Sequence, residues 1–391
     1  MTERKRVLFA QIKHSGYDRS VADGVAAFVR RHGHWMVAHV HVDAPLIPEV
    51  ARWYPGTKQR VFDGILIRHA AEGTRPTFFS TFKCPVVEIE HLRNPSAEHP
   101  CVLPDYIEAG RQAAVHFLSL GFRHFAACIS SRQPYQQKRW EGFRDGLRAA
   151  GHEAVLLDID QKNPSRKITR RTRIKQLADW LRKQPRPLAL LFGWIPSDGR
   201  LLEACDYAGL RIPEDIAVIA IGVSTVPCDL SWPTLTTVDL NLHTVGFQAA
   251  AQLDRLMRGA TDVPGVTYIP PVGVIPRMST DVVAVEDDVI VAATRLMRES
   301  APIPLSVDDV AARVGVGRRT LELRFRKALG RSPSREMRRL RIEHAKEMLR
   351  SSREKITAVA RHCGYRNYGD FLRAFQAAEG TSPTAYRARF P

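Results

Sequence analysis

The chain has 391 residues, of which 44% are hydrophobic, so it is long enough for two or three domains with sizeable cores. No segment approaches the roughly 18 uninterrupted apolar residues of a membrane span, and the charged start MTERKRVLFAQI runs into a strand-like segment rather than a signal peptide. The six cysteines form no C-x-x-C pair and no metal-ligand spacing. We therefore expect a cytoplasmic protein with reduced thiols and no membrane partner.

Positive charge is concentrated near the end of the chain. The net charge is +17, from 58 Lys and Arg against 41 Asp and Glu. Residues 286–391 hold 22 of the basic and 13 of the acidic residues, a net +9, which leaves 36 and 28, or +8, for the first 285 residues. A basic segment of this kind indicates a polyanionic partner, most commonly nucleic acid, although a solvated charged surface explains the same composition.

The first 280 residues alternate between strand and helix patterns. Amphipathic stretches such as SVADGVAAFVRR and KRWEGFRDGLRAAG separate the apolar runs. This βαβ rhythm builds parallel sheets, so an α/β domain is predicted for residues 1–281. Strands are expected at 6–12, 35–42, 63–68, 85–90, 124–130, 153–159, 188–193 and 216–222.

The pattern changes to helices alone after residue 281. A linker is predicted at 282–289 and an all-α domain at 290–391, without a strand-like run. Helical segments are expected at 287–299, 306–314, 317–329, 333–351, 356–362 and 368–379.

The helical domain contains an internal repeat. The offset is 49 residues before a turn and 50 after it, so the second copy has a turn that is one residue longer. Each copy, at about 307–328 and 356–379, is predicted to form helix, turn and helix, with Gly317 or Asn367 capping the second helix. The matched residues are Val310, Gly315, Leu321, Phe325, Gly330 and Ser332-Pro333 in the first copy and Val359, Gly364, Phe371, Phe375, Gly380 and Ser382-Pro383 in the second.

The second helix of each copy buries one face through its i, i+4 apolar pair and leaves the other face exposed. A helix of this size fits the major groove of double-stranded DNA, where arginine donates to guanine and glutamate accepts from cytosine. The helix at 333–351 would hold the two copies at a separation that suits two successive major grooves. The exposed faces carry Arg318, Arg319, Glu322 and Arg326 in the first copy and Tyr368, Asp370 and Arg373 in the second.

An S-P-x-x-Y-R motif, Ser382 to Arg387, follows the second copy. Two helix-turn-helix units, joined by a long helix and closed by this motif, resemble the DNA-binding domain of AraC/XylS-type transcription regulators. The resemblance implies base reading by Arg319 and Glu322 in the first unit and by Tyr368 and Arg373 in the second. The family usually has serine where this chain has Gly317, a departure that weakens only the capping bond.

The α/β part carries motifs of a second family. They resemble the periplasmic-binding-protein-like effector domain of LacI/GalR-type repressors. The resemblance implies two lobes, lobe 1 at 5–106 and 243–271 and lobe 2 at 109–240, with a sugar at the carboxyl ends of the strands. The motifs are R-x-x-G-F at Arg139 to Phe143, Pro-Ser-Asp at 196–198, IPEDIAVIAIG at 212–222 and P-x-L-T-T-V at 233–238.

The same resemblance implies which residues line the cleft and what they bind. Sugar-responsive regulators with this order of domains suggest a monosaccharide effector, xylose or a similar pentose. In the family, the loop after the first strand, the arginine of R-x-x-G-F and polar residues at strand ends meet the sugar, and an aromatic ring can stack on it. The corresponding residues are Tyr17, Asp18 and Arg19 in the predicted loop, and Glu90, Arg139, Trp194 and Asp198.

One position departs from the second family. Its members often have aspartate after the glycine that ends a strand, whereas this sequence reads A-I-G-V at 220–223. A ligand-holding carboxylate is therefore missing or moved to Asp229 or Asp239. The identity of the sugar is not fixed by the sequence.

The remaining signals are weak. His32, His34, His39 and His41 cluster without a carboxylate or cysteine at ligand spacing, so packed or solvated histidines are favoured over a metal site. No catalytic or cofactor-binding motif such as G-x-S-x-G, a Walker loop or H-E-x-x-H is present, and we predict no enzyme activity and no cofactor.

Two hypotheses from different classes remain. The first is a ligand-responsive transcription regulator that binds promoter DNA as a homodimer, with RNA polymerase as a further partner if it activates. The second is a sugar-binding or sugar-processing protein whose basic helical tail serves protein assembly. The repeat favours the first, because an assembly tail has no need of two recognition helices in matched registers.

Overall fold

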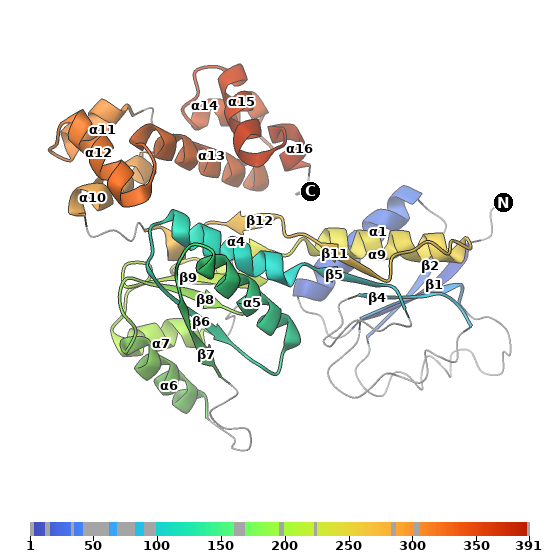
Figure 1. The fold of residues 1–391 in the computed structure, drawn as a ribbon. Coiled ribbons are helices and arrows are strands. Elements are labelled where there is room, and N and C mark those ends of the chain that lie inside the picture. Colours follow the sequence, from blue (N-terminus) through green and yellow to red (C-terminus); the bar gives the residue numbers. More distant parts are fainter. Residues whose placement is uncertain are drawn as a thin grey trace. The chain divides into compact units, whose positions relative to one another are not determined.

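The computed structural model describes residues 4–11, 16–32, 35–41, 62–68, 83–89, 99–159, 169–194, 199–222, 225–282, 287–300 and 305–388. The chain divides into two compact units, Met1–His116 with His124–Thr280, and Phe117–Arg123 with Asp281–Pro391. The described strands all lie in the first unit, and the described elements of the second unit between Asp288 and Arg387 are helices (Figure 1). Within the described ranges, no helix is long and apolar enough to cross a membrane.

Two six-stranded sheets form the described core of the first unit. The first sheet has the order β11-β5-β4-β3-β1-β2, and all its neighbouring strands are parallel. The second has the order β12-β10-β9-β8-β6-β7 and is parallel apart from the antiparallel β10–β12 pair. The strands are β1 (Lys5–Gln11), β2 (Trp35–His41), β3 (Gly64–Ile67), β4 (Val86–Ile89), β5 (Cys101–Pro104), β6 (His124–Ile129), β7 (Ala154–Asp158), β8 (Leu188–Phe192), β9 (Ile216–Gly222), β10 (Thr236–Asp239), β11 (Val266–Ile269) and β12 (Gly273–Ile275).

The predicted α/β class is confirmed, and the eight predicted runs overlap β1 to β4 and β6 to β9. Strands β5, β10, β11 and β12 were not predicted as strands. Strands β3 and β4 are equally short but lie in apolar runs. The four missed strands do not stand out in this way, because β5 and β11 run into a proline, β10 begins with two threonines and β12 has only three residues and begins with glycine.

Helices of the first unit pack in close pairs. Helices α1 and α9 lie side by side, as do α4 and α5 (Figure 1). A β-carbon on Gly142 of α5 would lie 1.9 Å from the carbonyl oxygen of Ile107, and one on Gly110 of α4 would lie 2.0 Å from that of Arg139. The α4–α5 contact therefore requires glycine on both helices. The helices are α1 (Gly16–His32), α4 (Tyr106–Ser119), α5 (Pro134–Arg148), α6 (Arg170–Arg182), α7 (Arg200–Ala208), α8 (Thr225–Leu230) and α9 (Leu242–Met257), with the 3-10 turn η1 (Met278–Thr280).

The chain passes between the two sheets after β5, after β10 and after β11. Backbone hydrogen bonds tie these passages together: Asp105 N donates to Ile269 O at 2.8 Å, and Val272 N donates to Asp239 O at 2.9 Å. The carboxyl ends of strands in both sheets are thus connected through three neighbouring segments. Such a set of crossings is where a two-lobed α/β protein bends.

The second unit consists of short helices around a long one. The six predicted segments match the observed helices to within one residue at most ends, and α16 was not predicted. The helices are α10 (Asp288–Glu299), α11 (Val307–Arg313), α12 (Arg318–Leu329), α13 (Pro333–Ser351), α14 (Ile356–His362), α15 (Tyr368–Glu379) and α16 (Pro383–Arg387).

The two copies of the internal repeat have the same glycine turn and the same buried pair, and they differ in the cap of the second helix. Gly315 and Gly364 have φ of 73° and 74°, a left-handed conformation that only glycine adopts without strain. Asn367 caps α15 by accepting from Asp370 N, whereas Gly317 has no side chain to cap α12. The buried pair of each copy, Leu321 with Phe325 and Phe371 with Phe375, lies in its own core.

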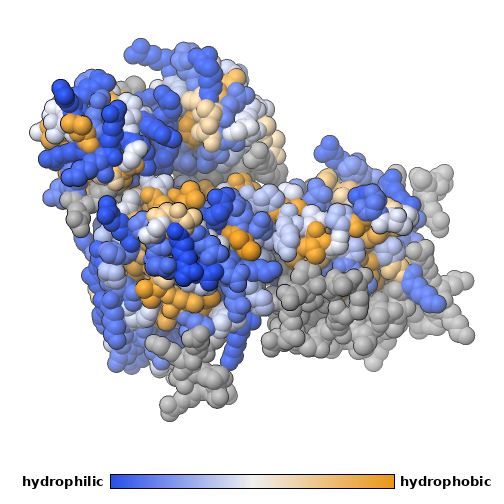
Figure 2. All heavy atoms as spheres, in the orientation of Figure 1, coloured by the Kyte–Doolittle hydropathy of each residue, from blue (hydrophilic) through white to orange (hydrophobic). Residues whose placement is uncertain are grey.

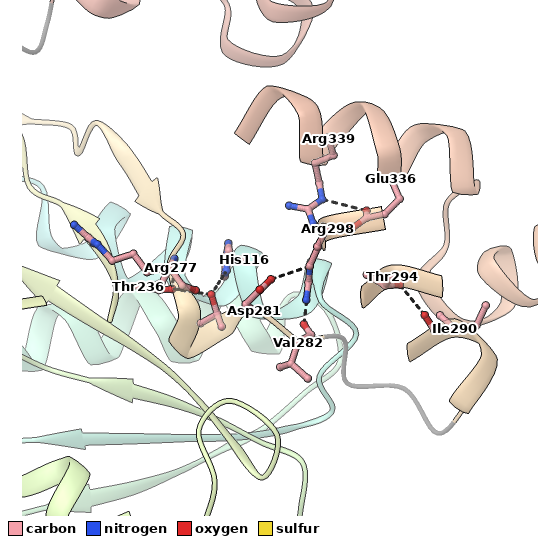
Figure 3. Close-up of polar contacts among 11 residues, drawn as sticks. His116, Thr236, Arg277, Asp281, Val282, Ile290, Thr294, Arg298, Glu336 and Arg339 are labelled. Atoms are coloured by element: carbon pink, nitrogen blue, oxygen red, sulfur yellow. Dashed lines mark hydrogen bonds and ion pairs between the residues drawn. The ribbon is translucent and has the colours of Figure 1, made fainter. Parts of the chain in front are cut away.

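A buried carboxylate sits between arginines on the long helix α13. Glu336 is fully buried and pairs with Arg339 at 2.7 Å (Figure 3). It also pairs with Arg331. Arg298 of α10 lies beside this pair and is bonded to Asp281 at 2.9 Å. Burial alone would raise the pKa of Glu336, but the hydrogen bond from Arg339 and the charges of Arg339 and Arg331 lower that pKa to about 2.

Gly142→Ala is expected to destabilise the first unit by about 3 kcal/mol or more, because the added methyl group would overlap a helix backbone that cannot move independently. Gly265→Ala is the matched control, because no atom lies within 4 Å of its added β-carbon. All six tryptophans lie before residue 281, so their fluorescence during urea unfolding reports on this unit. Equal midpoints for the two variants would contradict the close α4–α5 packing.

Glu336→Gln is expected to remove a pH-dependent part of the stability of the second unit. A carboxylate whose folded-state pKa is lowered to about 2 stabilises the fold fully above its usual value near 4.5, and this stabilisation is lost as pH falls toward 2. The full difference is on the order of 3 kcal/mol. Helix content during urea unfolding at pH 7, 4 and 3 measures it, with the less buried Glu343→Gln as control. Parallel losses in wild type and Glu336→Gln would contradict the prediction.

Candidate functional site

The first predicted ligand residues lie on a helix, which corrects their placement in a loop. Tyr17, Asp18 and Arg19 form the first turn of α1, which begins at Gly16. Asp18 is buried and ion-paired with Arg68, whose guanidinium also lies 3.9 Å from the centre of the Tyr17 ring. Arg19 is exposed. The structure therefore brings Tyr17 and Asp18 together around an arginine that sequence reasoning missed.

Two more polar residues at strand ends join this group. Gln11, the last residue of β1, donates through Nε2 to the carbonyl oxygen of Asp18 at 2.9 Å. His39 of β2 donates through Nε2 to Oε1 of Gln11 at 2.8 Å and stacks on Phe9. His39 is thus a packed histidine. The group lies at the carboxyl ends of β1, β2 and β3, the edge where α/β proteins bind ligands.

Arg139 lies in a separate group on α5. Its side chain is 4% exposed and donates through Nη1 to the carbonyl oxygens of Gly193 at 2.6 Å and Ile221 at 3.1 Å, at the ends of β8 and β9. The rings of Tyr106 and Tyr135 flank the guanidinium at 4.9 and 4.7 Å. Its Nε is buried without a hydrogen-bond partner among the described residues. A pocket of about 360 Å³ lies beside these rings and is also lined by Lys138.

The other ligand candidates are less informative. Trp194 is half-buried and packs against Phe192, with 4.4 Å between ring centres. Glu90 and Asp198 lie outside the described residues. The two carboxylates considered as replacements are both engaged: Asp229 pairs with Arg277 at 2.7 Å, and Asp239 accepts from the backbone N of Asn241 at 2.9 Å.

The second helices of the two repeats present the predicted DNA-contacting residues at the surface. On α12, Arg318 pairs with Glu322 at 3.1 Å and with Asp308 at 2.9 Å. Arg319 and Arg326 are exposed and make no side-chain ion pair or hydrogen bond within the described ranges. Their charges therefore remain available to a partner.

On α15, Arg373 pairs with Asp370, which also accepts from the Asn367 side chain at 2.7 Å. Tyr368 is 40% exposed at the first position of the helix. Hydrophilic residues cover most of the visible face of the helical unit (Figure 2).

Sequence reasoning overlooked Leu323 on the exposed face of α12. Its side chain is 61% exposed although it is large and apolar. Leu323 is two residues from both buried residues, Leu321 and Phe325, which places it about 200° around the helix from each. In a major groove an apolar side chain at this position can contact a thymine methyl group. The sequence could have revealed Leu323 as an exposed apolar residue, because it lies on the helix face opposite the buried i, i+4 pair.

Comparison with known proteins shows which class of protein this chain forms. Residues 114–280 match the family described as a periplasmic binding protein-like domain, and residues 310–389 match a helix-turn-helix domain. The protein is a DNA-binding transcription regulator in which an effector domain precedes the DNA-binding domain. The predicted combination of a LacI-like effector domain with an AraC-type helix-turn-helix domain is confirmed.

Particular relatives share the whole arrangement. The chain is 25% identical to the xylose operon regulatory protein of Escherichia coli K12, over 99% of this chain and 97% of the relative. It is similar to the solved structure of the xylose-binding transcription activator XylR, with a TM-score of 0.59, 23% identity and coverage of 99% and 98%. A LacI family regulator from Enterococcus faecium with bound ribose matches 71% of this chain and 98% of its own, with a TM-score of 0.55 and 18% identity.

Proposed function

We propose that this regulator is controlled by a monosaccharide, a pentose such as xylose, bound in the first unit. The observation that carries the proposal is Arg139, a buried guanidinium at two strand ends with an unused Nε donor. Burying a polar donor without a partner costs roughly 1–3 kcal/mol, and a sugar hydroxyl oxygen would accept from it. The names of the relatives, a xylose operon regulator and a ribose-bound regulator, support the same ligand class.

The proposed site combines Arg139 with the group around Asp18. Aromatic rings beside both groups, Tyr106, Tyr135 and Tyr17, suit the apolar face of a sugar. Glu90, Trp194 and Asp198 stay candidates from the family resemblance, and Arg68 joins them. Arg19 is the weakest member, because it is exposed and lies outside the buried group.

The proposed mechanism uses the three passages between the sheets. Sugar bound to both lobes would favour their closed arrangement, and the equilibrium would shift by the difference in affinity between the two arrangements. In a homodimer, this closure would change the spacing of the paired DNA-binding units over their half-sites. We further propose that the protein acts in the cytoplasm as an activator of sugar catabolism genes and contacts RNA polymerase.

Base reading is assigned to the exposed faces of α12 and α15. We propose that Arg319, Arg326 and Glu322 act in the first helix-turn-helix repeat, with Arg318 orienting Glu322 through their 3.1 Å ion pair. Tyr368 and Arg373 act in the second repeat, where the pair with Asp370 reduces the free positive charge. The first repeat therefore contributes more affinity.

Arg139→Lys is expected to weaken xylose binding at least tenfold, because lysine lacks the planar fork of donors that arginine presents at this position. Isothermal titration of the full chain with D-xylose, D-ribose and L-arabinose measures the effect. Arg144→Ala is the control, since Arg144 is on the same helix and pairs only with its neighbour Asp145. Unchanged affinity in correctly folded Arg139→Lys and Arg139→Ala would remove Arg139 from the site.

Arg319→Ala is expected to reduce affinity for a selected DNA site by roughly 10- to 100-fold, corresponding to the loss of a specific arginine–guanine contact. Arg373→Ala is expected to cost less, because Asp370 already neutralises part of its charge. Fluorescence anisotropy with duplexes selected from a randomised pool compares the two. A larger loss of affinity for Arg373→Ala would contradict the expectation that the first helix-turn-helix repeat contributes more to DNA affinity than the second.

A further inference from the structure

A groove of about 810 Å³ runs between the two helix-turn-helix units. One wall is the start of α11, the floor is α13, and the other wall is the turn before α15 and the exposed face of α15 itself. Four arginines line it and only one carboxylate does. They are Arg338 and Arg341 from α13, Arg366 from the turn, Arg373 from α15, and Asp370.

Two of these arginines form side-chain hydrogen bonds or ion pairs, and the other two form none within the described ranges. Arg341 donates to the carbonyl oxygen of Leu305 at 3.2 Å, and Arg373 pairs with Asp370. Arg338 and Arg366 are exposed and have no side-chain hydrogen bond or ion pair within the described ranges. The single acid is already shared between Arg373 and Asn367. The groove therefore presents positive charge that has no partner in the part of the chain that the structure describes.

The position of the groove indicates what it faces. Helix α13 has 19 residues and is about 28 Å long at 1.5 Å per residue, comparable to the roughly 34 Å between successive major grooves on one side of B-DNA. If α12 and α15 enter successive major grooves, the surface between them faces the minor groove and the two phosphate backbones that border it. Arg373 belongs both to the groove and to the reading face of α15, so the two surfaces are continuous.

We propose that this groove seats the DNA phosphate backbone between the two major grooves, with Arg338 and Arg366 as its phosphate contacts. The proposal rests on the DNA-binding function and extends it to a surface outside the two recognition helices. Charge complementarity selects a polyanion, and the continuity of the groove with the reading face of α15 through Arg373 selects duplex DNA. These contacts supply affinity that does not depend on sequence, while α12 and α15 supply the sequence preference.

The test measures how binding responds to salt. Binding constants of the full chain are measured between 50 and 200 mM salt for a selected duplex and for the same duplex with its bases scrambled. The variants are Arg338→Ala, Arg366→Ala and their combination, and Arg338→Lys, which keeps the charge. Lys183→Ala, an exposed charge of the first unit outside both DNA-facing surfaces, controls for net charge.

The double variant is expected to bind both duplexes more weakly by the same factor. The slope of log K against log salt should become shallower by about 1.8, at roughly 0.9 for each phosphate contact. Arg338→Lys and Lys183→Ala should keep the wild-type slope. This pattern of results would support the proposal that the groove binds the phosphate backbone of DNA.

Three outcomes would overturn the proposal. An unchanged slope in the double variant shows that no phosphate lies there, and a loss confined to the selected duplex assigns these arginines to base reading. Normal DNA binding combined with lost transcription activation assigns the groove to an acidic protein partner. Wild-type protein that binds neither duplex in a salt-sensitive way would instead refute the proposed DNA function itself, so the two failures are distinguishable.

Discussion

Glu336 is fully buried on α13, and the arrangement of the second unit depends on the positive charges that neutralise it. A buried carboxylate without partners is costly, so Arg331 and Arg339 must stay in place for α13 to pack. Lys346, further along the same helix, pairs with Glu379 of α15 at 3.0 Å. Helix α13 thereby holds the segment at Arg331 near its first turn and the recognition helix α15 near its last turns. The spacing of the two recognition helices follows from this rigidity.

The two copies share a backbone plan but differ in what they expose. Both bury an i, i+4 pair, reverse at a glycine and end at a left-handed glycine, Gly330 or Gly380. Each exposed face carries one internal ion pair, Arg318 with Glu322 on α12 and Arg373 with Asp370 on α15. The face of α12 adds two arginines with no side-chain partner among the described residues, Arg319 and Arg326, and the apolar Leu323. The two copies therefore match in the parts that fold and differ at the exposed surface. A regulator built this way can bind two major grooves with different base sequences by means of one repeated backbone arrangement.

Local chemistry explains why the helical unit was predictable. Capping residues, glycine turns and i, i+4 pairs act within four residues, so the sequence alone places α10 to α15. Strands β5, β10, β11 and β12 are short and interrupted by proline, threonine or glycine, so they carry no pattern of their own, and neighbouring strands complete their hydrogen bonds. The pairing of Arg68 with Asp18 joins residues 50 positions apart and depends on the tertiary fold. Glu336 pairs with arginines three and five positions away, and only its burial depends on tertiary packing. Residue type suggested Arg139, but only the fold reveals which carbonyls it holds.

Those carbonyls change the role that Arg139 can have. A guanidinium that reaches the ends of β8 and β9 fixes two strand ends in the second sheet before any ligand arrives. In the proposed site the orientation of this arginine is thus set by the chain itself, and such preorganisation would lower the entropic cost of binding a sugar. Asp229 and Asp239 are engaged elsewhere, but Asp105 and Glu108 line the pocket beside the two tyrosine rings, so this part of the proposed site offers carboxylate acceptors as well as donors. Discrimination among pentoses would then depend on which hydroxyl groups meet the fixed donor and which meet these acceptors.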